Sequence, residues 1–354
     1  QQVSSAASDV YKRQKLYRFT TNLALYFLKH YLFLRHSCEI ASHLLEIIMF
    51  GKTSLRVATG ALLLALAPMG AMAKTYQHSL GTVDIDGVPQ RVVVLGYGSL
   101  DYIDALGVTP VGMPKTLLPK SLEKFQIDSF ANTGSVKEVN FETLFMLKPD
   151  LIIAEGRMAD IYKDLSDIAP TYMFRIDTTD YWKTTQEHWR TLGDIFDKEE
   201  QAEQLIEGVQ EQINHLHTKV AAQPPRTLTV SNSGNSLAMF GTSSRFSFVY
   251  EEAGFATSTS ENVKSVPRTH GNLISFEYIA DAQPEVLLIL DREQAIGQSS
   301  GKAKQLFDND LVKSTPAAKN NRVLFMDPAA WYLTAGGYQS TQTMIKELNQ
   351  VIAN

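Results

Sequence analysis

The chain has 354 residues, of which 33 are basic, 38 are acidic and only one, Cys38, is a cysteine. A single cysteine excludes an internal disulfide and a cysteine-based metal site, so stability must come from a hydrophobic core. The net charge of −5 makes the chain a poor candidate for binding nucleic acid, and we expect no such partner.

Residues 1–48 lack the periodicity of a core-forming segment. Their apolar stretch at 23–34 is interrupted by Lys29 and His30, so it is too short and too charged to span a bilayer. We interpret residues 1–48 as an upstream or non-native extension. The alternative is a genuine amphipathic extension.

Residues 49–73 have the three parts of a secretory signal peptide. Lys52 and Arg56 make the basic part, "VATGALLLALA" is the apolar part, and Ala71–Ala73 is a small-residue cleavage site. No cysteine follows the apolar part, which argues against lipid attachment. We therefore predict a periplasmic, unlipidated mature chain that begins at Lys74 and carries 25 basic and 35 acidic residues.

The mature chain opens with a predicted strand, a glycine turn and a helix over residues 91–108. Gly96 and Gly98 match the first two positions of a dinucleotide-binding fingerprint, but Asp101 occupies the third. The sequence also lacks a phosphate-binding loop, a nucleophilic serine elbow and a metalloprotease motif. We therefore expect a protein that is not an enzyme.

An internal repeat dominates the rest of the sequence. "FETLFMLKPDLIIAEGR" at 141–157 aligns without a gap with "FEYIADAQPEVLLILDR" at 276–292, an offset of 135 residues. Each copy predicts a short helix, a proline break and a buried strand of the kind found in parallel sheets. Each copy ends with an arginine just past its strand, Arg157 or Arg292.

Residues 197–222 predict one long helix, because strong helix formers and apolar residues at helical spacing run through them. We therefore predict an α/β fold of two Rossmann-like lobes, residues 74–196 and 223–354, joined by this helix. Ligands bind outside the carboxyl ends of strands in such sheets and often between domains. Arg157 and Arg292 should then face one inter-lobe cleft.

A third arginine, Arg245 in "GTSSRFSF", lies at a predicted junction between a loop and a helix. Three guanidinium groups would suit a compact, multiply anionic and aromatic ligand, because arginine pairs with anions and stacks on rings. The alternative for any one of these arginines is a surface salt bridge.

Two further residues carry metal-binding chemistry: His270 in "RTHGN" and Tyr332 in "DPAAWYLTAGG". Imidazole suits iron, and phenolate is a hard oxygen donor. Neither residue can hold a metal alone, but both could complete the coordination of a metal already bound by a chelator. Otherwise His270 is a hydrogen-bonding loop residue and Tyr332 a packing aromatic. Gly336 and Gly337 provide either room for a ligand or an ordinary turn.

Glu142 and Glu277 occupy equivalent positions of the repeat, near the starts of the two helices. A carboxylate there complements the helix dipole and can cap backbone donors. One exposed acid on each lobe would equally suit a symmetric partner that docks across both lobes.

The mature chain resembles the periplasmic binding proteins of ABC importers for iron–siderophore complexes, in the class with two lobes joined by one long helix (class III). "NFETLFMLKPDLIIAEGR" is the segment that carries the family resemblance. A second set of motifs resembles those of the catecholate-siderophore binders of the enterobactin and petrobactin type. The motifs are "SSRF", "RTHGN", "FEYI" with "LLILDR", and "DPAAWYLTAGG".

The resemblance implies a monomer that captures a ferric catecholate siderophore and delivers it to an inner-membrane ABC transporter, with no intrinsic cofactor. Arg157, Arg245 and Arg292 would surround the iron–catecholate centre. His270 and Tyr332 would coordinate Fe(III) when the siderophore leaves two sites open. Glu142 and Glu277 would meet arginines of the permease.

Two alternatives remain open at this point. The first is a binding protein for haem, cobalamin or a hydroxamate siderophore, although an arginine triad argues against a neutral ligand. The second is an exported metal-dependent enzyme that uses His270 and Tyr332 on a bare ion.

Overall fold

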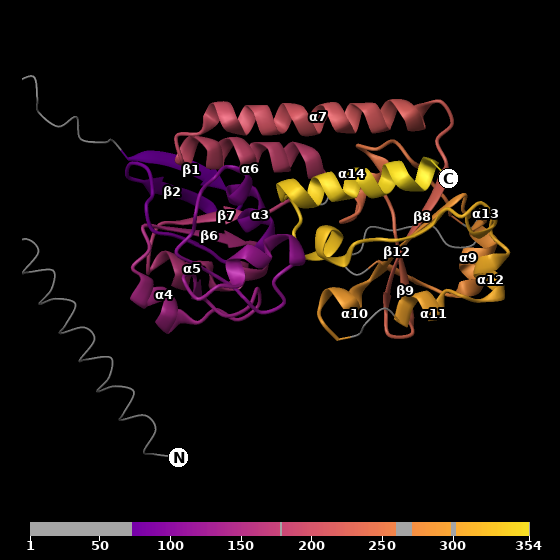
Figure 1. Ribbon diagram of the computed structural model, residues 1–354, viewed down its shortest axis with the longest axis horizontal. Helices are drawn as coiled ribbons and strands as arrows, with labels where there is room; N and C mark the ends of the chain where they lie inside the picture. The colour runs from indigo at the N-terminus through magenta and orange to yellow at the C-terminus, as the bar shows by residue number, and fades with distance from the viewer. Residues whose placement is uncertain (1–72, 178, 260–270, 299–301, 354) are drawn as a thin grey trace, which may run out of the picture. The chain divides into compact units, whose positions relative to one another are not determined.

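Two large β-sheets form the framework of the structure, one in each half of the chain from Lys74 onward (Figure 1). The computed structural model describes residues 73–177, 179–259, 271–298 and 302–353. The predicted extension, all but the last residue of the predicted signal peptide and His270 therefore lie outside the described residues. Within the described parts of the chain, no helix is long and apolar enough to cross a membrane.

The N-terminal lobe contains a five-stranded, all-parallel sheet of order β5-β4-β3-β6-β7 and a separate β1–β2 hairpin. Its strands are β1 (Lys74–His78), β2 (Gly81–Ile85), β3 (Val92–Val94), β4 (Gly112–Met113), β5 (Ala131–Asn132), β6 (Leu151–Glu155) and β7 (Thr171–Phe174). Its helices are α3 (Tyr97–Ala105), α4 (Phe141–Leu147), α5 (Tyr162–Ser166) and α6 (Tyr181–Ile195), with 3₁₀ turns η1 (Lys120–Gln126) and η2 (Gly156–Ile161).

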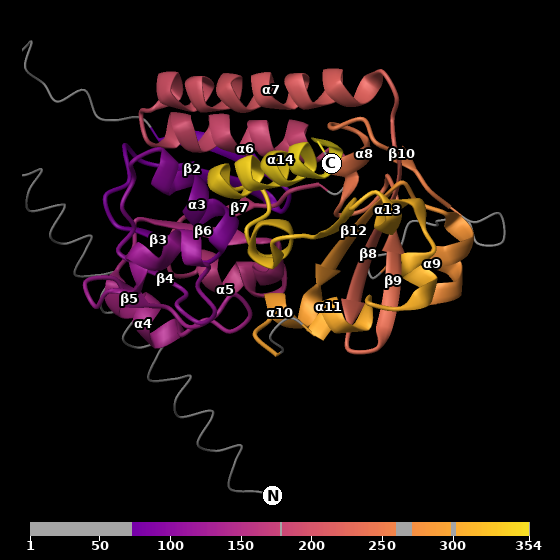
Figure 2. The ribbon, with the colours of Figure 1, turned by 45° about the vertical axis from the view of Figure 1, so that its right-hand side comes forward.

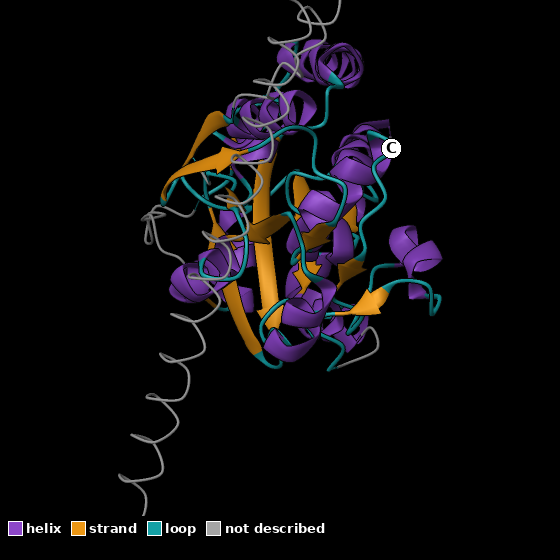
Figure 3. Ribbon diagram, turned by 90° about the vertical axis from the view of Figure 1, so that its left-hand side faces the viewer, coloured by secondary structure: helices purple, strands orange, loops and turns teal. Residues whose placement is uncertain are grey.

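The C-terminal lobe contains a six-stranded mixed sheet of order β11-β9-β8-β12-β13, with β10 also paired to β8. Its strands are β8 (Arg226–Ser233), β9 (Ser236–Phe240), β10 (Ala256–Thr257), β11 (Asn272–Ile274), β12 (Val286–Asp291) and β13 (Val323–Phe325). Its helices are α8 (Ser247–Tyr250), α9 (Phe276–Ala282), α10 (Arg292–Ala295), α11 (Lys302–Leu306), α12 (Asp310–Lys313) and α13 (Pro316–Lys319). Figure 3 shows the strands with helices on both sides.

The two halves of the repeat have the same local structure. The helix α4 is capped by Asn140, whose side chain accepts a hydrogen bond from the Thr143 amide, and α9 is capped in the same way by Ser275. Both helices end at a residue in the left-handed region, Lys148 at φ 46° and Gln283 at φ 44°. The predicted order of helix, break and buried strand is thus confirmed in both lobes.

The structure also extends the repeat upstream to Arg91 and Arg226, which are 135 residues apart. The Arg91 guanidinium donates to the Leu147 carbonyl at the end of α4 (Nε to O, 3.0 Å), and Arg226 donates to the Gln283 carbonyl after α9 (Nη2 to O, 2.9 Å). The acid that follows the proline in each copy, Asp150 or Glu285, accepts a hydrogen bond from the backbone amide of Arg91 or Arg226, respectively, at 2.8 Å. These contacts fix the end of each helix to the start of a central strand, β3 or β8.

The start of the C-terminal lobe differs from that of the N-terminal lobe. Whereas β3 leads directly to α3, β8 continues into β9, and residues 226–240 form an antiparallel hairpin in which Ser233 pairs with Ser236. Gly234, at φ 58°, takes the left-handed backbone that this two-residue loop requires and that glycine adopts without a steric penalty. The hairpin makes the second sheet mixed.

The predicted connecting helix is α7 (Glu199–Ala221), about 35 Å long at 1.5 Å per residue. Its buried residues recur every three or four positions, from Ala202 to Val220, and face α6 and α14 (Tyr338–Ala353) (Figures 1 and 2). The C-terminal helix α14 returns to the N-terminal lobe, where it packs on α3. The lobes are therefore joined by packed helices as well as by α7.

Candidate functional site

Tyr332 lies at the centre of a cluster of three arginines. The guanidinium carbon is 5.5 Å from the Tyr332 ring centroid for Arg157, 4.3 Å for Arg245 and 6.0 Å for Arg292. Tyr332 belongs to the one-turn π-helix η3 (Ala329–Leu333). The structure thus brings together four of the five predicted ligand-binding residues, from four separate segments.

Hydrogen bonds hold this arrangement from both lobes. Arg157, in η2 of the N-terminal lobe, donates from Nη2 to the Tyr332 carbonyl oxygen at 3.1 Å. Arg292, the first residue of α10 in the C-terminal lobe, donates from Nε to the Tyr332 hydroxyl at 3.3 Å and from Nη1 to the Ser233 hydroxyl at 3.2 Å. The site therefore straddles the two lobes.

Local structure explains how each arginine reaches the site. Arg157 and Arg292 follow the carboxyl ends of β6 and β12, as the repeat predicts. Arg245 precedes α8 in a turn held by Ser244, whose hydroxyl donates to the Gly241 carbonyl at 2.6 Å and accepts from the Phe246 amide at 3.2 Å. The ring of Phe246, the next residue, is fully buried, which anchors the turn.

The charges in the cluster are positive, and no carboxylate in the described part of the chain is paired with them. Among the described residues, the three arginines form no ion pair with a carboxylate. Burial lowers the pKa of Arg245, and the neighbouring charges of Arg157 and Arg292 lower it further. Burial alone would raise the pKa of the Tyr332 phenol, but the Arg292 hydrogen bond and the three positive charges outweigh it and lower that pKa. The cluster thus favours negative charge at this place.

Two cavities adjoin the cluster. The larger, of about 230 Å³, is lined by three serines, several apolar residues and side chains of the cluster. It is lined by Ser231, Ser233, Ser236, Ala238, Phe240, Arg245, Leu273, Leu290, Arg292 and Tyr332. A smaller one, of about 90 Å³, lies between Arg245 and Trp331. Flat rings and anionic oxygens would find complementary groups in the larger cavity.

His270 lies outside the described residues, so its predicted role is untested by the geometry. The next residue, Gly271, is described and has φ 74°. A Cβ atom on Gly271 would lie 2.9 Å from the Phe240 ring and 2.7 Å from the Met239 carbonyl oxygen. Gly271 therefore adjoins Phe240, which lines the larger cavity.

Glu142 and Glu277 lie exposed in the first turns of α4 and α9, one on each lobe. A hydrogen bond from Ser275 lowers the pKa of Glu277. Beside Glu142, the side chains of Phe145 and Met146 are 68% and 73% exposed. An exposed aromatic and an exposed methionine next to an acid make α4 a candidate contact surface.

The other residues of the segment around Tyr332 are structural. Trp331 is buried and donates from Nε1 to Glu347 at 2.7 Å. Gly336 donates to the Tyr181 hydroxyl and accepts from Trp189 Nε1, and a Cβ atom on Gly337 would lie 2.3 Å from Asp101 Oδ2. The glycines thus form a tight turn against the N-terminal lobe, so the interpretation as space for a ligand is wrong.

Sequence reasoning missed the role of Asp101. Its carboxylate accepts hydrogen bonds from the amides of Gln339 and Ser340 and from the Ser340 hydroxyl at 2.8–3.1 Å, at the start of α14. Gly98 allows the close approach, because its Cβ would lie 2.2 Å from the Ala335 carbonyl oxygen. The Gly-x-Gly turn therefore serves packing between α3 and the C-terminal segment. The signal in the sequence was the acid in place of the third glycine.

Comparisons with known proteins agree with this architecture. The chain is 37% identical to the petrobactin-binding protein YclQ of Bacillus subtilis over 262 residues, 73% of this chain and 81% of that protein. It is 31% identical to the ferric-anguibactin-binding protein FatB of Vibrio anguillarum over 277 residues, 77% of this chain and 85% of that protein.

Among solved structures, the periplasmic catecholate-siderophore binding protein VctP of Vibrio cholerae superposes with a TM-score of 0.75 and 38% identity, covering 78% of this chain and 99% of VctP. The periplasmic binding protein family model matches residues 92–330, which include Arg157, Arg245 and Arg292. On the strength of this match and of the relatives' identity, the chain belongs to the periplasmic binding protein family.

Proposed function

We propose that this protein captures a ferric siderophore with catecholate groups at the Tyr332 site and delivers it to an ABC transporter for iron uptake. The observation that carries the proposal is the convergence of Arg157, Arg245 and Arg292 on one phenol ring, with no carboxylate paired to them among the described residues. The relatives that bind petrobactin, anguibactin and catecholate siderophores support the same ligand class.

The chemistry of the cluster favours such a ligand. Ferric catecholates are anionic and aromatic, so guanidinium groups can donate charge-assisted hydrogen bonds to their oxygens and stack on their rings. These interactions are stronger in a partly desolvated site than in bulk water. Neutral ligands such as a ferric hydroxamate would leave three neighbouring positive charges uncompensated.

Tyr332 and His270 would act on the iron cargo itself. When a siderophore supplies only four donor atoms, two coordination positions on Fe(III) are left for the protein. The lowered pKa of Tyr332 favours the phenolate that would bind Fe(III). The contact of Gly271 with Phe240, in the wall of the larger cavity, supports a role for the neighbouring His270 at the same site.

Delivery would use the two exposed acids, Glu142 and Glu277, one on each lobe, which would meet basic residues of the permease. The exposed Phe145 and Met146 support a contact surface on α4. We further propose a monomer that is exported by the signal peptide Met49–Ala73, carries no lipid, binds no nucleic acid and has no catalytic activity.

Titration of the purified protein with ferric catecholates, a ferric hydroxamate, haem and cobalamin tests the proposal. Quenching of tryptophan fluorescence is a suitable signal, because Trp331 adjoins Arg245 across the smaller cavity. We expect the ferric catecholates to bind most tightly. Tighter binding of haem, cobalamin or the hydroxamate would overturn the proposal.

A further inference from the structure

A fourth arginine, Arg175, lies at the same end of the N-terminal-lobe sheet as Arg157, beyond the carboxyl ends of the strands. It directly follows β7, whose last residue Phe174 pairs in register with Glu155 at the end of β6. Gly156 and Arg175 therefore leave the sheet side by side, and a Cβ atom on Gly156 would lie 3.5 Å from Arg175 Cγ. Arg157 follows Gly156 in η2, two residues past the end of β6, so the two arginines follow adjacent strand ends.

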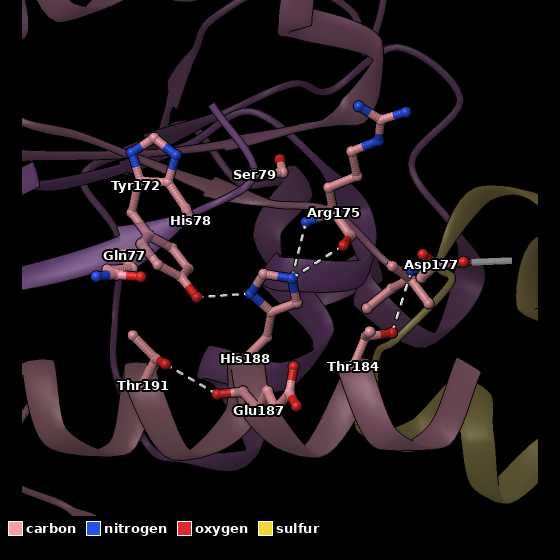
Figure 4. A pocket seen from close by; sticks show the side chains of 11 residues that line it. Gln77, His78, Ser79, Tyr172, Arg175, Asp177, Thr184, Glu187, His188 and Thr191 are labelled. Carbon is pink, nitrogen blue, oxygen red and sulfur yellow. Dashed lines mark hydrogen bonds between the residues drawn. The ribbon is translucent and has the colours of Figure 1, made fainter. Parts of the chain in front are cut away.

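The backbone of Arg175 is held in place by His188 of α6 (Figure 4). His188 Nε2 lies 3.1 Å from the Arg175 amide nitrogen and 3.0 Å from its carbonyl oxygen, and His188 Nδ1 lies 2.6 Å from the Tyr172 hydroxyl. Burial lowers the pKa of His188, which keeps the imidazole neutral in this role. Both ring nitrogens thus have a hydrogen-bond partner, and Nε2 bonds either the amide or the carbonyl of Arg175 according to the tautomer.

The residue after Arg175, Ile176, packs against the segment that contains Tyr332. A Cβ atom on Gly336 would lie 2.6 Å from Ile176 Cδ1, so Ile176 packs directly against the turn that follows Tyr332. Ile176 and Asp177 line the small cavity beside Arg245, and with Arg175 they also line a larger pocket of about 630 Å³ in the N-terminal lobe. Arg175 thus lines the larger pocket and directly precedes the two residues that both cavities share.

The Arg175 side chain is exposed and points away from His188 (Figure 4). Within the described ranges, its guanidinium makes no hydrogen bond or ion pair; only its backbone is bonded. Two acids line the same pocket, Glu187 and Asp177. Asp177 is already satisfied by the amide and hydroxyl of Thr179, both at 2.7 Å. Hydrogen bonds from Thr179 and, after them, the charge of Arg175 lower the pKa of Asp177, but in the described part of the chain the donors of the Arg175 guanidinium have no hydrogen-bond partner.

We propose that Arg175 is a further ligand-binding residue, which contacts a peripheral anionic oxygen of the siderophore, a catecholate or carboxylate oxygen, from the N-terminal lobe. Each lobe then supplies two arginines: Arg157 and Arg175 from one, Arg245 and Arg292 from the other. The planar fork of arginine suits a pair of adjacent oxygens, as in a catecholate or carboxylate. This inference rests on the proposed function.

The test is Arg175→Gln, titrated with a ferric bis-catecholate and a ferric tris-catecholate at several salt concentrations. Because Arg175 is exposed to solvent, loss of one charge-assisted contact there should have a smaller effect than at a buried arginine: it should raise Kd roughly fivefold to tenfold and make binding less sensitive to salt. Arg175→Lys, which keeps the charge but not the fork, should recover part of the affinity. Arg190→Gln is the matched control, because Arg190 is an exposed arginine of α6 that pairs with Glu203.

Because the Arg175 guanidinium has no partner within the described ranges, Arg175→Gln should leave the thermal unfolding midpoint unchanged. A Kd equal to that of the wild type, or one changed equally by Arg190→Gln, would overturn the inference while leaving the proposed function intact. If the wild type itself binds no ferric catecholate, the proposed function fails and the inference fails with it.

Discussion

Replacing Arg245 with glutamine should weaken ligand binding at the Tyr332 site while leaving the stability of the ligand-free fold almost unchanged. Arg245 has the shortest guanidinium-to-ring distance of the three arginines, 4.3 Å, and glutamine removes its charge while keeping a hydrogen-bond donor. A charge-assisted hydrogen bond to an anionic ligand contributes about 1.5–3 kcal/mol, so Arg245→Gln should raise Kd roughly tenfold to 150-fold.

The effect on the ligand-free fold should be small, because two contributions oppose each other. The substitution removes a cation–π contact with Tyr332 that contributes about 1–2 kcal/mol. It also relieves the burial of a charge and its repulsion by Arg157 and Arg292, the causes that lower the pKa of Arg245. We therefore expect a net change below about 1 kcal/mol, which is a shift of about 2–4 °C or less in Tm.

Fluorescence titration with a ferric bis-catecholate gives Kd, and thermal unfolding without ligand gives Tm. Arg245→Lys should lie between the wild type and Arg245→Gln in affinity, because lysine keeps the charge but lacks the planar fork. Arg190→Gln again serves as the surface control. Unchanged affinity in Arg245→Gln would refute its binding role, and a large loss of Tm would show that Arg245 is chiefly structural.

Three further changes test the Tyr332 site, the proposed docking surface, and the contact between Asp101 and the start of α14. Tyr332→Phe removes the oxygen that accepts from Arg292, so the charge-transfer band of bound ferric bis-catecholate should change; an identical spectrum would argue against coordination. Glu142→Arg combined with Glu277→Arg should abolish iron uptake by cells while Kd stays the same, and lost binding would point to a folding role instead. Burial raises the pKa of Asp101 to about 6, above roughly 3.9 in an unfolded chain, so its contribution to stability is fully present below about pH 4 and is lost as the pH rises through 6. Urea unfolding should therefore show a fall of about 3 kcal/mol over this range that Asp101→Asn removes, and equal pH dependence in both proteins would contradict the assignment.

The repeat made much of the fold predictable. A helix, a break and a buried strand at a fixed offset require the same backbone in both copies, and the left-handed residues Lys148 and Gln283 show how closely the copies agree. Arg91 and Arg226 are separated by the same offset of 135 residues, and they hydrogen-bond to the ends of α4 and α9, respectively. That pair was visible in the sequence, but its partners lie more than 50 residues away along the chain.

Contacts between distant segments account for what the sequence did not reveal. Gly98 and Gly337 appear as turn residues in the sequence. Their lack of a side chain matters because a distant segment packs closely against each: Ala335 against Gly98, and Asp101 against Gly337. The β8–β9 hairpin has no counterpart in the N-terminal lobe, so the repeat did not predict it. Arg175 has no counterpart in the repeat, so only the register of β6 and β7 places it beside Arg157.

The position of Tyr332 would link ligand binding at the proposed site to the relation between the lobes. Its carbonyl is held by Arg157 of the N-terminal lobe, and its hydroxyl is held by Arg292 of the C-terminal lobe. The turn that follows it is fixed to the N-terminal lobe through Trp189 and Tyr181. A shift of one lobe against the other must therefore change the distance from the phenol to Arg292 or from the carbonyl to Arg157. Because an anionic ligand would compete for the same guanidinium donors, binding at this site and the packing between the lobes depend on the same few hydrogen bonds.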